Sequence, residues 1–263
     1  MTSYESITLK IDSGIARLTL NDPDRRNAMT LSMGREIESA VESLNADPDV
    51  RVVIVSGAGK SFSAGGSLAT LARQAGMEVD GEDMGGGRVF YNAFLSLRSL
   101  QMPTIAAING HAIGAGLCFA LGCDMRIAHE RAKMGMTFVK LGIHPGMAAT
   151  WNLPRLIGPS AAAELLYTGR VIGAAEALRI GLVGRVAGDD FTDVVDSTAR
   201  EICENGPVAL RLLKETLAGT AGRTIEEAVG READAQQQTF ETEDAREGIT
   251  AMMEKRAPRF SGR

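Results

Sequence analysis

The sequence is poor in cysteine and holds no long apolar run. Its three cysteines, Cys118, Cys123 and Cys203, form no CxxC pair, so neither a disulfide framework nor a zinc ribbon is expected. No apolar stretch reaches the ~18 to 20 residues that a membrane-spanning helix needs. The first six residues show neither a basic segment nor an apolar signal core. These absences predict a soluble, cytoplasmic protein with reduced thiols and no membrane partner.

An excess of positive charge is also missing. The chain has 28 basic and 33 acidic residues, and this balance does not indicate a protein that binds a nucleic acid. The three histidines, His111, His129 and His144, do not stand at metal-ligand spacing, so no metal and no redox cofactor is expected. Apolar residues make up 44% of the 263 residues, which is enough to fill one large domain, with or without a small appendage.

Alternation and short apolar runs predict strands in the first half of the chain. Residues 7–11 and 15–20 alternate around an Asp-Ser-Gly turn, as the strands of a β-hairpin do. Residues 52–55 and 105–108 are continuous apolar runs, the pattern of strands buried on both faces. Residues 125–128 are a candidate third strand of this kind.

Helical spacing appears between these strands and dominates the second half. From about Ser32 the apolar residues share one helical face, and Asp47 and Pro48 end that helix. Later segments with apolar residues at helical spacing are residues 193–204, 208–218 and 224–240. Residues 76–87, with three consecutive glycines, are expected to form a loop. Buried strands that alternate with helices predict an α/β core followed by a helical C-terminal part.

Two glycine-rich segments imitate nucleotide-binding motifs. Residues 56–61 (SGAGKS) lack the first glycine of a P-loop, because that position is Ile54. Residues 114–119 (GAGLCF) have Phe119 where a dinucleotide fingerprint needs its third glycine. A serine-hydrolase triad has no anchor, since no serine stands in a GxSxG sequence. Nucleotide binding and serine-based hydrolysis are therefore not expected.

Two glycine-rich segments that adjoin or overlap these carry a different signature. Residues 62–68 (FSAGGSL) and 106–116 (AAINGHAIGAG) closely resemble the paired motifs of the enoyl-CoA hydratase/isomerase (crotonase) superfamily. Further segments that resemble this superfamily follow the same order along the chain: residues 24–28, 122–124, 141–146, 165–170, 174–177 and 181–183. The resemblance implies an α/β fold with a crotonase-like ββα spiral core in residues 1–195. It also implies a helical C-terminal trimerisation region in residues 196–263.

The physical chemistry of the two turns agrees with this resemblance. Glycine lets a backbone or a ligand approach closely, and each turn can leave an N–H group without a partner. Two such groups at one point form an oxyanion hole, in which one donor is worth ~3 to 4 kcal/mol in a transition state. By the resemblance, the donors are the N–H groups of Gly66 and Ala115. The alternative is that the turns only connect strands to helices.

The resemblance also implies an acyl-CoA or enoyl-CoA thioester as substrate, with no cofactor besides. The residues that match the CoA-binding segments of the superfamily are Arg25, Arg26, Ala28, Ala64, Gly65, Ser67, Leu68 and Phe260. The two arginines would meet CoA phosphates, or else they are solvated surface side chains. Residues 254–260 resemble a terminal helix that closes the CoA site, often in a neighbouring subunit. A homotrimer or a dimer of trimers is therefore expected.

The acid-base positions depart from the pattern of a hydratase. Hydratases of the superfamily use two glutamates, and the matching positions here are Cys118 and Phe138. Phenylalanine cannot accept a proton, and a buried thiol is a poor base. One positioned acid or base contributes ~10² to 10⁴ in rate, so the loss of both predicts little hydratase activity.

His144 and Cys118 are the candidate replacements. His144 lies in the segment that borders the acyl pocket in the superfamily, and histidine changes its charge near neutral pH. The alternative for His144 is a structural role beside Pro145, and the alternative for Cys118 is that it is only a small core residue. Two functions stay open: a lyase or isomerase that works through an oxyanion-hole-stabilised enolate, and a non-catalytic acyl-CoA-binding pseudoenzyme.

Overall fold

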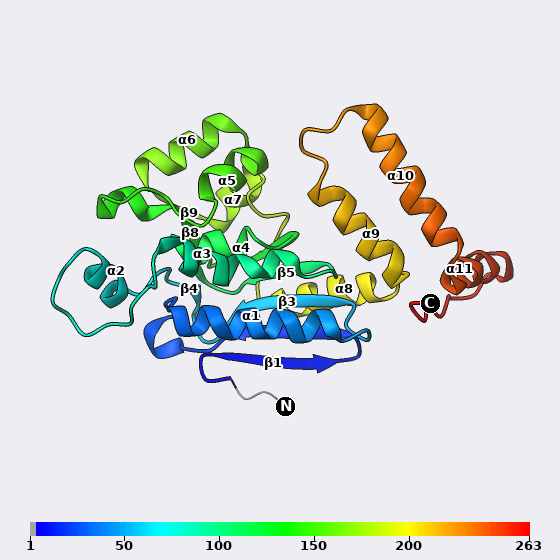
Figure 1. Ribbon diagram of the computed structural model, residues 1–263, viewed down its shortest axis with the longest axis horizontal. Coiled ribbons are helices and arrows are strands. Elements are labelled where there is room, and N and C mark those ends of the chain that lie inside the picture. Colours follow the sequence, from blue (N-terminus) through cyan, green and yellow to red (C-terminus); the bar gives the residue numbers. More distant parts are fainter. Residues whose placement is uncertain (1–3) are drawn as a thin grey trace.

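The computed structural model describes residues 4–263 as a mixed α/β protein built on a larger and a smaller sheet (Figure 1). The first three residues of the predicted core lie outside the described residues. The strands of the larger sheet, in spatial order, are β1 (Ile7–Asp12), β2 (Ile15–Leu20), β3 (Val52–Gly57), β5 (Thr104–Ile108), β7 (Met125–His129) and β10 (Arg185–Ala187). The β1–β2 hairpin is antiparallel, and the remaining pairs are parallel.

The smaller sheet repeats the order of the larger one. Its strands are β4 (Ser61–Ser63), β6 (His111–Ile113), β8 (Lys133–Gly135) and β9 (Val171–Gly173). Strands β4, β6 and β8 follow β3, β5 and β7 directly in the chain, and they are paired in the same order. Each repeat therefore adds one strand to each sheet before the chain turns into a helix, which is the predicted ββα spiral.

Helices cover both faces of the larger sheet and continue beyond it. The α-helices are α1 (Leu31–Ala46), α2 (Leu68–Gln74), α3 (Gly87–Leu95), α4 (Ala115–Ala120), α5 (Ala149–Ile157), α6 (Pro159–Thr168), α7 (Ala174–Arg179), α8 (Phe191–Cys203), α9 (Pro207–Ala218), α10 (Ile225–Phe240) and α11 (Glu243–Glu254). The short 3₁₀ helices are η1 (Pro23–Arg25), η2 (Ser96–Ser99) and η3 (Thr137–Leu141).

The central strands are buried on both faces, as their continuous apolar runs predict. In β3, Val53 and Val55 join the main core, whereas Val52 and Ile54 join a second cluster with residues of α8. This division follows from the period of two along a strand. The predicted boundary between residues 195 and 196 falls inside α8, because that whole helix packs on the sheet.

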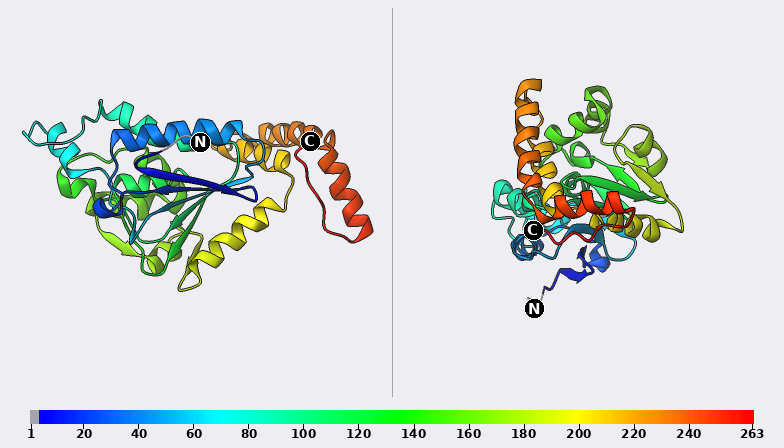
Figure 2. Two further views of the ribbon diagram at one scale, coloured as in Figure 1. Left: turned by 90° about the horizontal axis from the view of Figure 1, so that it is seen from below. Right: turned by 90° about the vertical axis from the view of Figure 1, so that its right-hand side faces the viewer.

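The C-terminal helices leave the body of the protein. Helices α10 and α11 lie at one end of the molecule, beyond the sheets (Figure 1, orange and red; Figure 2). Helix α9 is tied to the body by Lys214, whose ammonium group donates to the Met102 carbonyl oxygen at 2.8 Å and pairs with Asp124 at 2.9 Å. The prediction of a helical C-terminal part is therefore confirmed.

The expected helix over residues 254–260 is wrong. Helix α11 ends at Glu254, and Lys255 takes a left-handed conformation with φ of 55°. Pro258 follows and cannot continue a helix. The tail is held instead by the buried Asp244, whose carboxylate accepts hydrogen bonds from the N–H groups of Ser261 and Gly262 at 2.6 and 2.9 Å.

Asn27 ties the loop before α1 to the β3–β4 connection. Its side chain is fully buried, and its amide group donates to the carbonyl oxygens of Ala58, Ser61 and Phe62 at 3.0, 2.9 and 3.2 Å. The backbone of Asn27 has a φ of 54°, a left-handed conformation that asparagine tolerates better than most residues. The loop and the connection are therefore held in one arrangement by a single side chain.

We predict that Asn27→Ala lowers the free energy of unfolding by about 2 to 4 kcal/mol, because it leaves buried carbonyl oxygens without donors. Urea unfolding at a fixed protein concentration measures this loss. The control is Asn92→Ala, at an exposed position of α3, which should change stability by no more than ~0.5 kcal/mol. Equal stabilities of the two variants would contradict the role given to Asn27.

Candidate functional site

A cavity of about 580 Å³ opens where the two glycine-rich turns meet. It brings together most of the residues that the sequence predicts for the site: Arg25, Arg26, Ala28, Ala64, Gly65, Gly66, Ser67, Leu68, Ala115, Phe138 and His144. These residues come from separate elements, namely η1 and the loop after it, the turn before α2, the start of α4, and η3 with the loop that follows. The ββα spiral therefore collects them at one edge.

Glycine is required where the two turns touch. A Cβ atom at Gly65 would lie 2.6 Å from the Ile113 carbonyl oxygen and 3.4 Å from the Ala115 nitrogen. A Cβ atom at Gly116 would lie 2.6 Å from the Ser63 carbonyl oxygen. Gly114 has φ of 54° and ψ of −121°, a conformation that residues with a Cβ rarely adopt. The contact is thus main chain against main chain, with no room for side chains.

Two backbone N–H groups at this contact have no acceptor in the part of the chain that the structure describes. Gly66 bridges to Met29 only through its neighbours: Met29 donates to the Gly65 carbonyl at 2.8 Å, and Ser67 donates to the Met29 carbonyl at 3.0 Å. Ala115 is the first residue of α4, where an N–H has no partner inside the helix. Gly66 and Ala115 both line the cavity, so its wall holds two unpaired main-chain donors.

The loop that follows η1 is bonded to the first glycine turn. Ala64 donates to the Arg26 carbonyl oxygen at 2.9 Å, and the Ser63 hydroxyl donates to the Asn27 carbonyl at 2.7 Å. These bonds hold the segments that match the CoA-binding motifs side by side. Arg25 and Arg26 are exposed at this edge, so positive charge stands beside the cavity.

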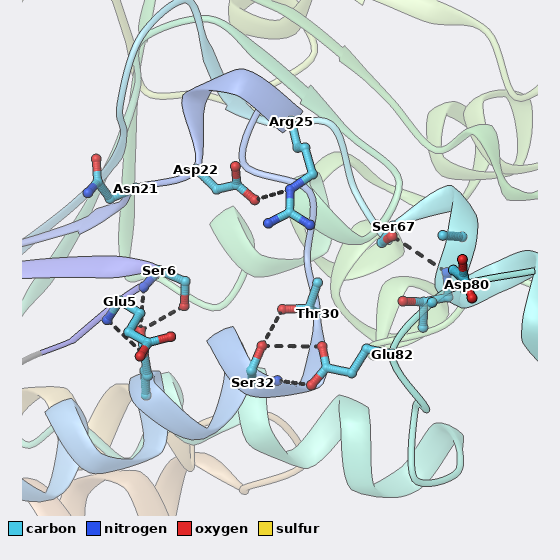
Figure 3. Close-up of a pocket in the computed structure, with 14 residues that line it drawn as sticks. Glu5, Ser6, Asn21, Asp22, Arg25, Thr30, Ser32, Ser67, Asp80 and Glu82 are labelled. Atoms are coloured by element: carbon cyan, nitrogen blue, oxygen red, sulfur yellow. Dashed lines mark hydrogen bonds and ion pairs between the residues drawn. The ribbon is translucent and has the colours of Figure 1, made fainter.

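A second, polar cavity of about 460 Å³ adjoins the first and shares Arg25, Ser67 and Ala69 with it. Arg25 projects into this space, with its Nε 2.8 Å from the Asp22 carboxylate (Figure 3). Another carboxylate there, that of Glu82, accepts from the backbone N–H of Ser32 at 2.7 Å (Figure 3). Arg25 is therefore the one basic residue among the described residues that line this cavity, which also has five acidic residues: Glu5, Asp22, Glu36, Asp80 and Glu82.

His144 has a defined tautomer. Its Nδ1 lies 2.8 Å from the Pro145 carbonyl oxygen, and a carbonyl oxygen only accepts hydrogen bonds, so Nδ1 carries the proton. In the neutral ring, Nε2 then has a lone pair available to a molecule in the cavity. The side chain is exposed and lines the cavity beside η3, which also contributes Thr137 and Lys140.

Cys118 does not line the cavity. It is fully buried in α4, and its Sγ lies 3.6 Å from the Gly146 carbonyl oxygen and 3.8 Å from Met136 Sδ. Burial raises the pKa of the Cys118 thiol to about 12, so the thiol is neutral near pH 7. Phe138, in contrast, is half-buried, and its Cζ would lie 3.9 Å from a Cβ atom on Gly114. An aromatic ring therefore stands next to the second glycine turn.

Phe260 lies away from the other predicted residues within this chain. It lines a separate cavity formed by α9, α10 and α11, and its ring packs against Gly206 and Gly248. The cause is the course of the C-terminal helices, which carry the tail beyond the sheets (Figure 2). Its predicted contact with CoA in a neighbouring subunit stays a prediction.

Most of one wall of the cavity was not predicted from the sequence. Its residues come from α2 and α3: Leu71, Phe90 and Tyr91. The spacing of Phe90 and Phe94, whose rings pack at a centroid distance of 4.9 Å, carried a helical signal for α3. The glycines before it obscured that signal. These residues add apolar surface to the cavity that holds the two unpaired donors.

The comparison with known proteins agrees with this geometry. The chain matches the family model described as enoyl-CoA hydratase/isomerase over residues 10–263. A crotonyl-CoA hydratase of Syntrophomonas wolfei is 40% identical over 260 residues, which cover 98% of this chain and 98% of that protein. A solved enoyl-CoA hydratase of Bacillus anthracis has a TM-score of 0.91 at 35% identity, with 98% of this chain and 100% of that chain covered.

A more distant structure gives the same result. An enoyl-CoA hydratase from Mycobacterium tuberculosis H37Rv has a TM-score of 0.87 at 29% identity, with 98% of this chain and 99% of that chain covered. The spiral of paired sheets and these likenesses define the crotonase fold. The chain belongs to the enoyl-CoA hydratase/isomerase family, whose members act on CoA thioesters. Across residues 4–263, no helix has the length and apolar character needed to cross a membrane.

We predict that Cys118 resists alkylation in the folded protein. At pH 8 a thiol with a pKa of about 12 is ionised to only about 10⁻⁴. Cys123 has the same predicted behaviour, since burial raises its pKa to about 12 as well. Cys203 is only half-buried, and it serves as the internal control.

The measurement is peptide mapping after brief treatment with iodoacetamide at pH 8. We expect label on Cys203 before unfolding and on Cys118 only after it. Native labelling of Cys118 at the rate of Cys203 would show that its thiol is reachable and reactive.

Proposed function

We propose that this protein binds an acyl-CoA or enoyl-CoA thioester and stabilises its enolate with the N–H groups of Gly66 and Ala115. The observation that carries the proposal is the pair of unpaired main-chain donors on one cavity wall. Each such donor contributes a factor of ~10² to 10³ in rate when charge develops on an oxygen in front of it. In this arrangement the thioester oxygen lies between the two turns.

The CoA moiety extends from the cavity past the loop after η1. Ala28, Ala64 and Leu68 provide surface for the pantetheine chain, and Arg25 and Arg26 supply positive charge for its phosphates. Support comes from the bonded pairing of this loop with the first glycine turn and from the exposure of both arginines. No cofactor takes part in this proposal, because the thioester itself is the substrate.

The acid-base groups of the cavity favour proton transfer at carbon over the addition of water. Among the described residues that line it, none carries a carboxylate, and Phe138 stands beside the donors. His144 offers Nε2 as a base, and a double-bond isomerisation needs a proton shuttle but no activated water. We therefore infer an isomerase-type reaction through an enolate.

A specific observation favours one alternative. The cavity wall formed by Phe138, Phe90 and Met84 is apolar, and an apolar wall with no carboxylate suits a protein that binds acyl-CoA without converting it. Such a pseudoenzyme would keep the affinity for the thioester and the two donors. The two functions differ in one measurable property, the exchange of protons on the acyl chain.

Crotonyl-CoA is the first substrate to test, because a 40% identical relative is a crotonyl-CoA hydratase. The experiment incubates the protein with crotonyl-CoA in heavy water and follows the thioester by mass spectrometry. We expect deuterium to enter the acyl chain without the mass of added water. Binding without exchange would support the pseudoenzyme, and rapid addition of water would contradict the preference for proton transfer.

Replacement of His144 tests its role when the same assay is run with 3-butenoyl-CoA, whose α-carbon carries the protons that a base removes. His144→Gln should slow the exchange by about 10²- to 10⁴-fold, the usual contribution of a positioned base. Binding of the thioester should be unchanged, because the donors and the arginines remain. The control is His111→Gln, which alters an exposed histidine of β6 that does not line the cavity. Equal exchange rates for the two variants would remove His144 from the mechanism.

We propose further that the chain assembles as a homotrimer or a dimer of trimers. Support comes from large apolar side chains that stand exposed on the C-terminal helices: Leu213, Leu217, Ile225, Val229, Ile249, Met252 and Met253. Large apolar side chains exposed in numbers on neighbouring helices are expected where a protein interface forms. An assembly would also give Phe260 a neighbouring subunit to contact.

We expect light scattering to give three or six times the mass of the 27.8 kDa chain. Leu213→Glu with Leu217→Glu, one turn apart on α9, should reduce that mass to the monomer, because a buried charge is costly. The control is Thr150→Glu at an exposed position of α5. A wild-type protein with the mass of one chain would refute the proposed assembly.

A further inference from the structure

Tyr91 lines the cavity and carries a hydroxyl group that no role described above uses. It lies in α3, is half-buried and lines the same cavity as Gly66, Ala115 and His144. Throughout residues 4–263, its hydroxyl makes no hydrogen bond to another protein group. The ring is braced by Phe90, which is buried and meets it edge-on at a centroid distance of 6.3 Å and an angle of 74°.

The tip of the ring lies against Gly146. A Cβ atom at Gly146 would lie 2.6 Å from Tyr91 Cζ and would also meet the hydroxyl oxygen, so only glycine leaves room for the phenol. On its carbonyl side, Gly146 accepts a weak hydrogen bond from the Cys118 thiol at 3.6 Å. Gly146 is therefore in contact with both side chains, the buried thiol and the phenol that reaches the cavity.

This position is informative because Cys118 matches a place where hydratases of the superfamily carry a carboxylate. The thiol of Cys118 is enclosed by Gly146 and Met136 and does not line the cavity. The phenol of Tyr91 contacts the same glycine and does line it. A side chain with a hydroxyl group thus lies on the cavity wall and contacts the same glycine as the residue at the carboxylate position.

Other hydroxyl groups of the cavity are less suited to donate a proton. Ser67 accepts from the Thr70 N–H at 3.5 Å as the cap of α2, and Thr137 carries an aliphatic alcohol. A phenol is a stronger acid than an aliphatic alcohol, because its ring delocalises the negative charge of the phenolate. A phenol is also a stronger acid than the C–H group that forms when an enolate is protonated. The transfer of its proton to carbon is therefore favourable in free energy.

We propose that Tyr91 is a catalytic residue that protonates carbon when the enolate collapses, an inference that rests on the proposed function. With 3-butenoyl-CoA, Nε2 of His144 removes a proton from the α-carbon, and the electron pair of that C–H bond enters a dienolate held by the two donors. The O–H bond of Tyr91 then breaks, and its proton forms a new C–H bond at the γ-carbon. The product is crotonyl-CoA.

The charges and protons of this reaction balance within the cavity. The negative charge passes from the thioester oxygen to the phenolate, while His144 holds the proton taken from the α-carbon. Water in the open cavity carries that proton back to the phenolate. One proton has left the α-carbon and one has reached the γ-carbon, so the reaction is an isomerisation that consumes nothing.

The test compares two processes in heavy water with 3-butenoyl-CoA. Exchange at the α-carbon needs only His144, because the dienolate can take a proton back from the imidazolium. Formation of γ-deuterated crotonyl-CoA needs Tyr91. We expect Tyr91→Phe to lower product formation by about 10²- to 10⁴-fold while α-exchange and thioester binding persist. The exchange-to-product ratio therefore rises.

The matched control is Tyr167→Phe, which removes the same hydroxyl from a side chain that is 83% exposed on α6. A structural role for Tyr91 would lower exchange and product together or leave both unchanged, and either result overturns the inference. Wild-type protein that neither exchanges nor isomerises would overturn the proposed function as well. An active wild type with an unchanged ratio in Tyr91→Phe would overturn the role of Tyr91 alone.

Discussion

The contact between two stretches of main chain shapes the rest of this protein. The turn after β4 and the turn before α4 touch through Gly65 and Gly116, at distances that leave no space for a Cβ atom. Each turn follows a strand of the smaller sheet, and that sheet has the same strand order as the larger one. The spiral therefore brings the two turns together. The loop after η1 is bonded to the same place by Ser63 and Asn27. The positions of the cavity, of the two N–H donors and of the two arginines all depend on this contact.

A site whose main function comes from the main chain can change its side chains freely. The donors of Gly66 and Ala115 need only glycine-rich turns, whereas the acid-base groups are ordinary side chains around the cavity. The family to which the chain belongs can therefore keep thioester polarisation while the proton-transfer groups move. We infer such a move here, from the positions of Cys118 and Phe138 to His144 and Tyr91. The phenol depends on a glycine at position 146, since any larger residue would displace it.

Much of this arrangement was predictable from the sequence. The hairpin, β3, β5, β7 and α1 follow from periodicity, because their apolar residues face a core on one side or both. The strands of the smaller sheet could not be predicted in this way, since each has three residues and shows no period. The cavity residues of the two turns were found because glycine-rich signatures are local. Tyr91 was missed because its role depends on a contact with Gly146, 55 positions away in the chain. The burial of Cys118 and the position of Phe260 are likewise set by tertiary packing.

The central claim is that two backbone N–H groups polarise a thioester carbonyl in this cavity. Its most direct test is the infrared frequency of the thioester C=O, labelled with ¹³C at the carbonyl carbon, for crotonyl-CoA bound to the protein. Two donors that hold the oxygen weaken the C=O bond, so we expect the bound thioester to absorb at a lower frequency than in water. Ala115→Pro removes one N–H at a helix position that tolerates proline, and it should reverse part of the shift. A bound thioester with the frequency found in water would contradict the account.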